Sequence, residues 1–196
     1  MSDIFSKIFT EICDDPFNVL MREKGYKPLY TANSRAKIVI VGQAPGRLAQ
    51  ETQKPWNDKS GETLREWLGV TAEQFYNPEI FSLLPMDFYY PGKGKNGDLP
   101  PRKGFAEKWH PILIEHMPNI QLFVLIGAYA QKFYLGNKNK KNLTETVRAY
   151  QEFLPKFFPI VHPSPLNFRW RKQNPWFENE IIPVLQNQIH EILANK

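Results

Sequence analysis

Two apolar runs that each end in a loop stiffened by glycine or proline constrain this chain most. The run 37–41 is followed by Gly-Gln-Ala-Pro-Gly at 42–46, and the run 157–161 by His-Pro-Ser-Pro at 162–165. Uninterrupted apolar strands are typical of a parallel sheet covered on both faces. In such sheets the ligand site lies beyond the carboxyl ends of the strands. We therefore expect 42–46 (the first loop) and 162–165 (the second loop) to form one pocket at the ends of adjacent strands.

The rest of the chain alternates between strand and helix patterns. Apolar runs predict four strands, at 37–42, 79–84, 120–126 and 157–161. The spacing of apolar residues predicts helices at 3–14, 60–68, 105–117, 127–135, 144–151 and 176–193. Because strands that alternate with helices form parallel sheets with helices on both faces, the sequence predicts an α/β fold. The expected architecture is a three-layer α/β/α sandwich with a central four-stranded parallel sheet.

Three segments carry local expectations. Ser60 is the candidate N-cap of the helix at 60–68. Pro183 is expected to interrupt or kink the last helix, because proline lacks the backbone N–H that a helix interior requires. The loop at 85–104 contains four prolines and four glycines, together with aromatic residues, so we expect it to be ordered and functional rather than a linker.

Composition limits the class of protein. A chain of 196 residues, 42% of them apolar, can bury one core, and we expect a single domain over 1–196, with 1–34 as an N-terminal helical and loop extension packed on it. The net charge of +5 favours an acidic partner, nucleic acid first. The single cysteine, Cys13, excludes an internal disulfide and an all-cysteine metal site. No leader pattern or membrane-length apolar run is present, so a cytoplasmic protein without membrane contact is expected.

The first loop does not fit a nucleotide-binding glycine loop. It lacks the third glycine of the dinucleotide pattern and the Gly-Lys-Ser/Thr ending of a phosphate loop. Pro45 also removes one backbone donor and fixes φ, so this loop presents few groups in a rigid arrangement. A different kind of ligand is indicated.

Both loops, in this order, resemble motifs A and B of the uracil-DNA glycosylase superfamily. The chain is most similar to the bacterial and archaeal branch whose motif A reads Gly-Glu-Ala-Pro-Gly, and the resemblance extends over residues 35–190. Lys-Pro-Trp-Asn-Asp-Lys-Ser-Gly at 54–61 lies where that branch has a Pro-Phe segment before a helix. Leu-Ile-Gly-Ala-Tyr-Ala at 125–130 lies where it has a strand ending in glycine. The resemblance implies a uracil-DNA glycosylase-like fold.

The resemblance also implies roles for individual residues. His162 would donate a hydrogen bond to the base carbonyl on which negative charge accumulates, and Trp56 would stack on the base after it leaves the duplex. The implied substrate-binding residues are Gly42, Ala44, Pro45, Gly46, Trp56 and Ser60. The implied DNA-binding residues are Ser164, Leu166, Asn167, Arg169 and Arg171, with Leu166 or Phe168 as a wedge. Each role has a structural alternative. Trp56 would be a core residue, His162 would only satisfy a backbone carbonyl, and the segment with Arg169 and Arg171 would be a solvated basic loop.

The chain departs from the family at the catalytic carboxylate. Gln43 stands where the related branch has glutamate, and Ala44 where the best-known branch has aspartate. A carboxamide can orient a water but cannot act as a general base. Asp87, after the second strand, is therefore added to His162 and Gln43 as the third catalytic candidate, and it is expected to read the base or supply the missing charge. Asp98 is a further candidate, and a surface loop aspartate is the alternative for Asp87.

These observations predict a monofunctional DNA glycosylase of base excision repair. It would flip uracil or another deaminated base out of single- or double-stranded DNA and hydrolyse the N-glycosidic bond. The cysteines that hold an iron–sulfur cluster in the related branch are absent, so no cofactor and no metal are expected, and we assume a monomer. Two alternatives stay open: a catalytically inactive nucleic-acid-binding protein of the same fold, and a hydrolase of free nucleosides.

Overall fold

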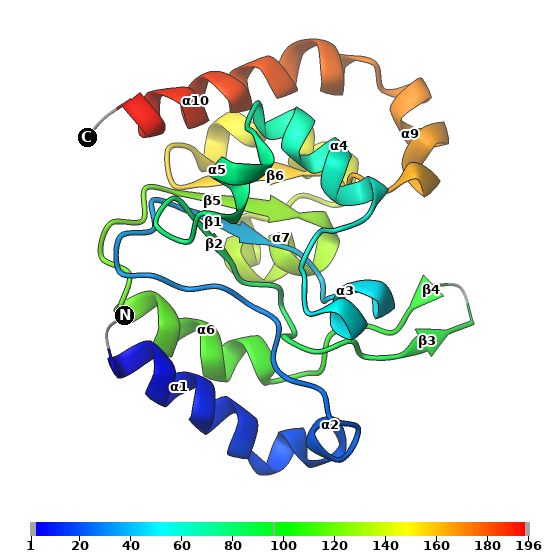
Figure 1. Ribbon diagram of the computed structural model, residues 1–196. Helices are drawn as coiled ribbons and strands as arrows, with labels where there is room; N and C mark the ends of the chain where they lie inside the picture. The colour runs from blue at the N-terminus through cyan, green and yellow to red at the C-terminus, as the bar shows by residue number, and fades with distance from the viewer. Residues whose placement is uncertain (1–2, 96, 195–196) are drawn as a thin grey trace.

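The computed structural model describes residues 3–95 and 97–194. Its centre is a sheet of four parallel strands in the order β2-β1-β5-β6. The strands are β1 (Ile38–Val41), β2 (Phe81–Leu83), β5 (Leu122–Ile126) and β6 (Phe157–Ile160). Helices cover both faces of this sheet (Figure 1). The predicted α/β/α sandwich is confirmed, and each of the four predicted strands is present with shorter bounds.

One hydrophobic core lies between the sheet and the helices on its first face. Val39 and Val41 of β1 point into it together with Phe123 and Leu125 of β5, because alternate residues of a strand share a face. The helices of this face are α1 (Asp3–Asp14), α6 (Phe105–Glu115) and α7 (Gly127–Leu135). Ile8 of α1 is buried in the same core, so the N-terminal helix covers the sheet alongside α6.

The second core lies on the opposite face. Ile38 and Ile40 of β1 point into it, with Val124 of β5 and Phe158 of β6. The helices of this face are α4 (Lys59–Leu68), α5 (Ala72–Tyr76), α8 (Leu143–Arg148) and α10 (Ile182–Ala194). With apolar side chains buried on both faces, the strands form the middle layer, and polar chemistry is confined to the loops at their ends.

The strands that precede the two loops are not neighbours, so the expectation of adjacent strands is wrong. β5 lies between β1 and β6 and pairs with both. The two loops still border one cavity, because all three strands are parallel and their carboxyl ends lie at the same edge. The chain places β2 on one side of β1 and β5 on the other. The first loop, which follows β1, therefore lies where the strand order reverses, the usual position of a ligand in such a sheet.

Two helix boundaries show how local sequence sets the structure. Helix α4 is capped by Asp58 rather than by Ser60, since the Asp58 carboxylate accepts a hydrogen bond from the Gly61 N–H at 3.0 Å. The C-terminal helix changes its winding just before Pro183, without the break predicted there. A π-helical turn at Phe177–Ile181 precedes α10, whose second residue is Pro183.

Several short elements lie where no regular structure is expected from the sequence. They are α2 (Val19–Glu23), α3 (Arg47–Thr52), α5, α9 (Phe168–Gln173) and the hairpin of β3 (Lys93–Gly94) and β4 (Gly97–Asp98). The hairpin belongs to the loop at 85–104, and both it and α9 project on the side to which the strands point (Figure 1). Across 3–95 and 97–194, no helix combines the length and apolar character needed to cross a membrane.

Candidate active site

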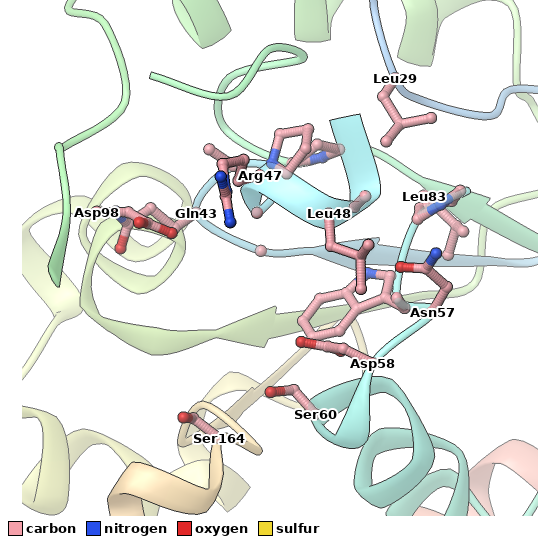
Figure 2. Close-up of a pocket in the computed structure, with 18 of the residues that line it drawn as sticks. Leu29, Gln43, Arg47, Leu48, Asn57, Asp58, Ser60, Leu83, Asp98 and Ser164 are labelled. Carbon is pink, nitrogen blue, oxygen red and sulfur yellow. The ribbon is translucent and has the colours of Figure 1, made fainter. Parts of the chain in front are cut away.

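A cavity of about 370 Å³ lies at the carboxyl edge of the sheet, between the first loop, the segment before α4 and the second loop (Figure 2). The residues expected to act together and found in its wall are Gly42, Gln43, Ala44, Pro45, Gly46, Trp56, Ser60, His162 and Ser164. In Figure 2, Ser60 and Ser164 approach each other on one side of this space, while Gln43 and Asp98 lie together at its other end. The first loop is anchored to the loop after β2, since the Gly42 carbonyl accepts a hydrogen bond from the Met86 N–H at 2.8 Å.

A second cavity, of about 230 Å³, adjoins the first. Both cavities are lined by Gln43 and His162, and the second also by Gly127 and Tyr129 at the start of α7 and by Asn167. The two candidate catalytic side chains therefore stand between two hollows rather than at the bottom of one. This arrangement offers room for a base on one side of the reacting bond and for backbone or sugar on the other.

His162 is a neutral hydrogen-bond donor by geometry. Its Nδ1 lies 3.2 Å from the Ser164 nitrogen and accepts that N–H, so the proton of the neutral ring is on Nε2. Burial lowers the pKa of His162, and the nearby Asp58 carboxylate opposes this shift. The imidazole is therefore uncharged at pH 7. The His162 carbonyl accepts a hydrogen bond from the Asn167 side chain at 2.7 Å, which fixes the loop that carries the ring.

Trp56 is held beside His162 by strained backbone. The two ring centroids are 5.7 Å apart with planes inclined by 31°. Trp56 has φ of 54°, in the left-handed region that residues with a Cβ rarely adopt. Its carbonyl oxygen accepts hydrogen bonds from Arg65 at 3.0 Å and from the Tyr76 hydroxyl at 3.1 Å. A Cβ at Gly61 would lie 1.8 Å from the same oxygen, so position 61 requires glycine if Trp56 is to keep this place.

Gln43 is tied to the hairpin by its carboxamide. Its Nε2 donates a hydrogen bond to the Leu99 carbonyl at 2.9 Å, and its own main-chain carbonyl accepts the Asp87 N–H at 3.2 Å. The Leu99 contact joins the first loop to the chain just beyond β4. It also orients the amide, since its nitrogen is engaged and its oxygen is left to face a ligand or water.

Asp87 lies outside both cavities, and its surroundings do not suit the expected catalytic role. The side chain is fully buried, and both carboxylate oxygens accept hydrogen bonds from Arg102, at 2.7 Å from Nε and 2.8 Å from Nη2. A carboxylate held by a guanidinium fork is fixed and charge-balanced. The pair joins the start of the 85–104 loop to its end. We assign Asp87 to the ordering of this loop, which carries the hairpin.

Two other carboxylates line the larger cavity. Asp98, at the end of β4, is exposed, and its contact is a long one of 3.4 Å with the Tyr90 hydroxyl. Asp58 lies two residues after Trp56. Its negative charge raises the pKa of His162, against the larger lowering by burial. Asp58 is missing from the residues chosen by sequence. Its position just before a helical pattern is a typical N-cap, and that pattern could have placed it beside Trp56.

The residues expected to contact DNA fall into two groups. Leu166 and Phe168 are 93% and 64% exposed, as wedge residues must be, and Arg169 is exposed and without an ion pair in the described chain. Arg171 instead pairs with Glu178, at 2.5 Å, and its guanidinium lies 5.5 Å from the ring centroid of Trp67. Arg169 is thus available to a phosphate, whereas Arg171 is engaged by the fold.

Two comparisons with known proteins show what this chain resembles. A family model described as the uracil DNA glycosylase superfamily matches residues 29–186, which include both loops and the start of α4. Among solved structures, the chain is similar to a solution NMR structure of a candidate uracil DNA glycosylase from Methanosarcina acetivorans. The two share 14% sequence identity, the match covers 81% of this chain and 94% of the other, and the TM-score is 0.47. On the extent of the family match, this chain belongs to the uracil DNA glycosylase superfamily.

Proposed function

We propose that the protein is a monofunctional DNA N-glycosylase that hydrolyses the bond between deoxyribose and uracil or another deaminated base. The observation that carries this proposal is the orientation of His162. Its Nδ1 is occupied by the Ser164 N–H, and its Nε2–H is left as a donor at a cavity whose wall also contains the Trp56 ring. A base stacked on the indole would bring a carbonyl oxygen within reach of this donor.

The chemistry that this arrangement favours is dissociative. When the N-glycosidic bond breaks, its electron pair goes to the base, and negative charge develops on the carbonyl oxygen next to the bond. A neutral imidazole donor stabilises that charge more than it stabilises the uncharged substrate, and this difference lowers the barrier. Water then adds to the sugar carbon as hydroxide, and its proton goes to the solvent or to the departing base.

The sugar cation needs a negative group or an oriented water, and three side chains of the cavity wall are suited to these tasks. Gln43 can hold a water through its amide oxygen but cannot take its proton. Asp58 and Asp98 are carboxylates at opposite ends of the cavity. We propose that one of them faces the sugar. The variants Asp58→Asn and Asp98→Asn distinguish the two carboxylates. Only substitution of the one near the anomeric carbon should lower the rate of base excision, by roughly 100-fold or more.

DNA is the proposed substrate because the exposed groups next to the cavity suit it. Leu166 and Phe168 could fill the gap left by an extruded base, and Arg169 could neutralise a phosphate. The net charge of +5 also favours a negatively charged substrate such as DNA.

The test uses oligonucleotides that each contain one deaminated base, uracil or hypoxanthine, in single- and double-stranded form. Cleavage of the products at abasic sites reveals excision, and the His162→Leu variant is the control for contaminating glycosylase. Abasic sites made by the wild type alone support the proposal. Their absence with every deaminated base contradicts it, and turnover of free nucleosides without DNA would identify the protein as a nucleoside hydrolase.

Gln43 favours a second candidate, a base-binding protein without catalysis. Its uncharged amide stands in motif A, where the related branch has glutamate, and that amide is engaged by Leu99. Such a protein would bind DNA with a steep salt dependence and produce no abasic sites. Gln43→Glu separates the candidates: activity that appears only in this variant means that the wild type lacks the required carboxylate.

A further inference from the structure

The β3–β4 hairpin is fastened to the rest of the protein through Leu99. The Leu99 N–H donates a hydrogen bond to the Gly92 carbonyl at 2.9 Å, which closes the hairpin at its base. The Leu99 side chain lies over the hairpin, since a Cβ at Gly94 would be 3.2 Å from one of its methyl carbons. The Leu99 carbonyl in turn accepts the N–H of the Gln43 side chain at 2.9 Å. Within 91–95 and 97–100, this is the one hydrogen bond to a residue outside the 85–104 loop, so Gln43 holds the hairpin in place.

The contact with Leu99 requires an amide at position 43. A main-chain carbonyl only accepts hydrogen bonds, so its partner must carry an N–H or an O–H. Glutamine supplies an N–H. An ionised glutamate would instead turn a negatively charged oxygen toward the Leu99 carbonyl oxygen, and methionine, which is of similar length, has no donor. The absence of charge on Gln43 therefore has a structural reason, which is the docking of the hairpin.

The hairpin carries a carboxylate into the larger cavity. Asp98 is the last residue of β4, directly before Leu99, and it lines the cavity wall. Figure 2 shows Asp98 and Gln43 together at one end of this cavity. Within the described chain, the Asp98 carboxylate accepts one hydrogen bond, a long one of 3.4 Å from the Tyr90 hydroxyl of the same loop. Its negative charge is therefore left available to a ligand.

Asp98 is better placed than Asp58 to face the sugar. Asp58 caps α4, with one carboxylate oxygen held by the Gly61 N–H at 3.0 Å, and its charge raises the pKa of His162 against the larger effect of burial. Asp58 therefore belongs to the end of the cavity where the departing base becomes negative. A second negative charge there opposes bond breaking, because like charges repel. Asp98 lies at the opposite end, where a carboxylate stabilises the positive sugar.

We propose that Gln43 is a positioning residue, whose amide docks the hairpin through Leu99 and thereby holds the Asp98 carboxylate against the sugar of the extruded nucleotide. This inference rests on the proposed function, because it names the residue that meets the sugar cation. When the N-glycosidic bond breaks, its electron pair leaves with the base, and the charge of Asp98 stabilises the cation. Water then forms the new bond to the sugar carbon, and the proton that it loses passes to the Asp98 carboxylate and on to the solvent.

NMR-detected hydrogen exchange of the Leu99 amide measures docking without catalysis. In Gln43→Met, which has no donor, this amide should exchange roughly two- to tenfold faster than in the wild type at every pH. In Gln43→Glu the same increase should be present at pH 7 and shrink toward pH 4.5. A protonated carboxyl donates its O–H to the Leu99 carbonyl, and this bond favours the protonated form.

Gln186→Met is the matched control for docking. The Gln186 side chain also donates to a main-chain carbonyl at 2.9 Å, that of Glu66, but this bond joins α10 to α4. Its loss should therefore leave the exchange of Leu99 unchanged.

A cationic sugar analogue tests the role of Asp98. An oligonucleotide with a pyrrolidine in place of one deoxyribose carries the positive charge of the sugar cation, whereas one with tetrahydrofuran at the same place is neutral and of the same shape. The wild type should bind the pyrrolidine oligonucleotide more tightly by on the order of tenfold or more. Asp98→Asn should abolish this preference, and Gln43→Met should reduce it. In the Asp98→Asn background, the substitution of Gln43 should change it no further, since Gln43 acts through Asp98.

Three results would overturn the inference: wild-type exchange of Leu99 in Gln43→Met, a preference for pyrrolidine that survives Asp98→Asn, and a preference that depends on Asp58 instead. Excision assays keep the inference apart from the proposed function. If the wild type forms abasic sites but does not prefer pyrrolidine, the glycosylase proposal stands and the role of Asp98 fails. If no abasic sites form while the preference depends on Asp98 and Gln43, the glycosylase proposal fails, and the two residues hold the sugar of a nucleotide that is bound but not cleaved.

Discussion

His110 and His162 are two histidines in apolar surroundings whose ring nitrogens are used differently. At His110, Nδ1 lies 2.7 Å from the Tyr134 hydroxyl and Nε2 3.0 Å from the Pro85 carbonyl oxygen, so both nitrogens are satisfied by the protein. At His162, only Nδ1 has a partner among the described residues, the Ser164 N–H. His110 is fully buried in the core, whereas His162 is half-buried at the wall of the cavity. The unused donor at a cavity is the reason we propose His162, rather than His110, as the catalytic donor.

The pKa shifts lead to the same distinction. Burial lowers the pKa of His110 to about 4, against a small opposing effect of its bond with Pro85. Burial also lowers the pKa of His162, and Asp58 opposes it. Both rings are neutral at pH 7. In His110 this neutrality serves the fold alone, whereas in His162 it leaves an uncharged donor for a substrate.

The largest effect should come from His162→Leu. Loss of one donor aimed at developing charge lowers a catalytic rate by roughly 100- to 1,000-fold. Single-turnover excision of uracil measures this loss, and urea unfolding should change by less than about 1 kcal/mol, as is usual where no packed core group is removed. A rate within a few-fold of the wild type would remove His162 from the mechanism.

His110→Phe should reverse the pattern. Phenylalanine fills about the same space as the imidazole but has no hydrogen-bonding groups. The Pro85 carbonyl and the Tyr134 hydroxyl therefore lose their partner in the core, which should lower the free energy of unfolding by about 2–3 kcal/mol. Urea unfolding should detect this destabilisation. Excision by the folded variant, measured well below its melting temperature, should stay within a few-fold of the wild type. A loss of activity as large as that of His162→Leu would mean that the distinction between the two histidines is false.

Acid should destabilise the wild type through His110. In the unfolded chain this histidine takes up a proton near its ordinary pKa of about 6.5, whereas in the folded protein it resists protonation down to about pH 4. The stabilisation is therefore complete above pH 6.5 and is lost as the pH falls toward 4, by about 1.4 kcal/mol per unit. Urea unfolding between pH 7 and 4.5 measures the slope, which should be shallower in His110→Phe. An identical slope in both proteins would contradict the assignment.

The smallest effects extend the comparison to Arg169 and Arg171. Arg169→Ala should weaken DNA binding and reduce the slope of log K against log salt by about 1, as expected for one lost phosphate contact. Arg171→Ala removes the pair with Glu178 and the contact with Trp67, so it should lower stability more than the salt slope. Fluorescence anisotropy at several salt concentrations, together with melting curves, separates the two. Equal salt slopes for the two variants would show that the ion pair does not withhold Arg171 from DNA.

The strands and their loops could be predicted because their signals are local. β1 and β6 are apolar runs that end at Gly42 and just before His162, and such patterns predict buried strands. The order β2-β1-β5-β6 is not a local property, so the position of β5 between β1 and β6 does not follow from the sequence pattern. The hairpin and α9 are short and polar, and they depend on contacts that periodicity does not reveal.

The choice of carboxylate shows the same limit at the site. Asp87 follows a predicted strand, which made it the natural candidate, but its partner Arg102 lies at the other end of a long loop. Asp98 reaches the cavity only because a hairpin forms, and Asp58 because it caps α4. The tertiary contacts of each loop decide which carboxylate faces the cavity, and the spacing of residues in the sequence does not predict these contacts.

The central claim is that His162 is a neutral imidazole with its proton on Nε2, directed at the base. Nitrogen-15 NMR of histidine-labelled protein measures this directly, with the His162→Leu variant identifying the resonance. The account predicts an unprotonated Nδ1 and a protonated Nε2 at pH 7, and a shift of the Nε2–H signal when uracil-containing DNA binds. A charged ring at pH 7, the opposite tautomer, or an Nε2–H signal unaffected by this DNA would contradict it.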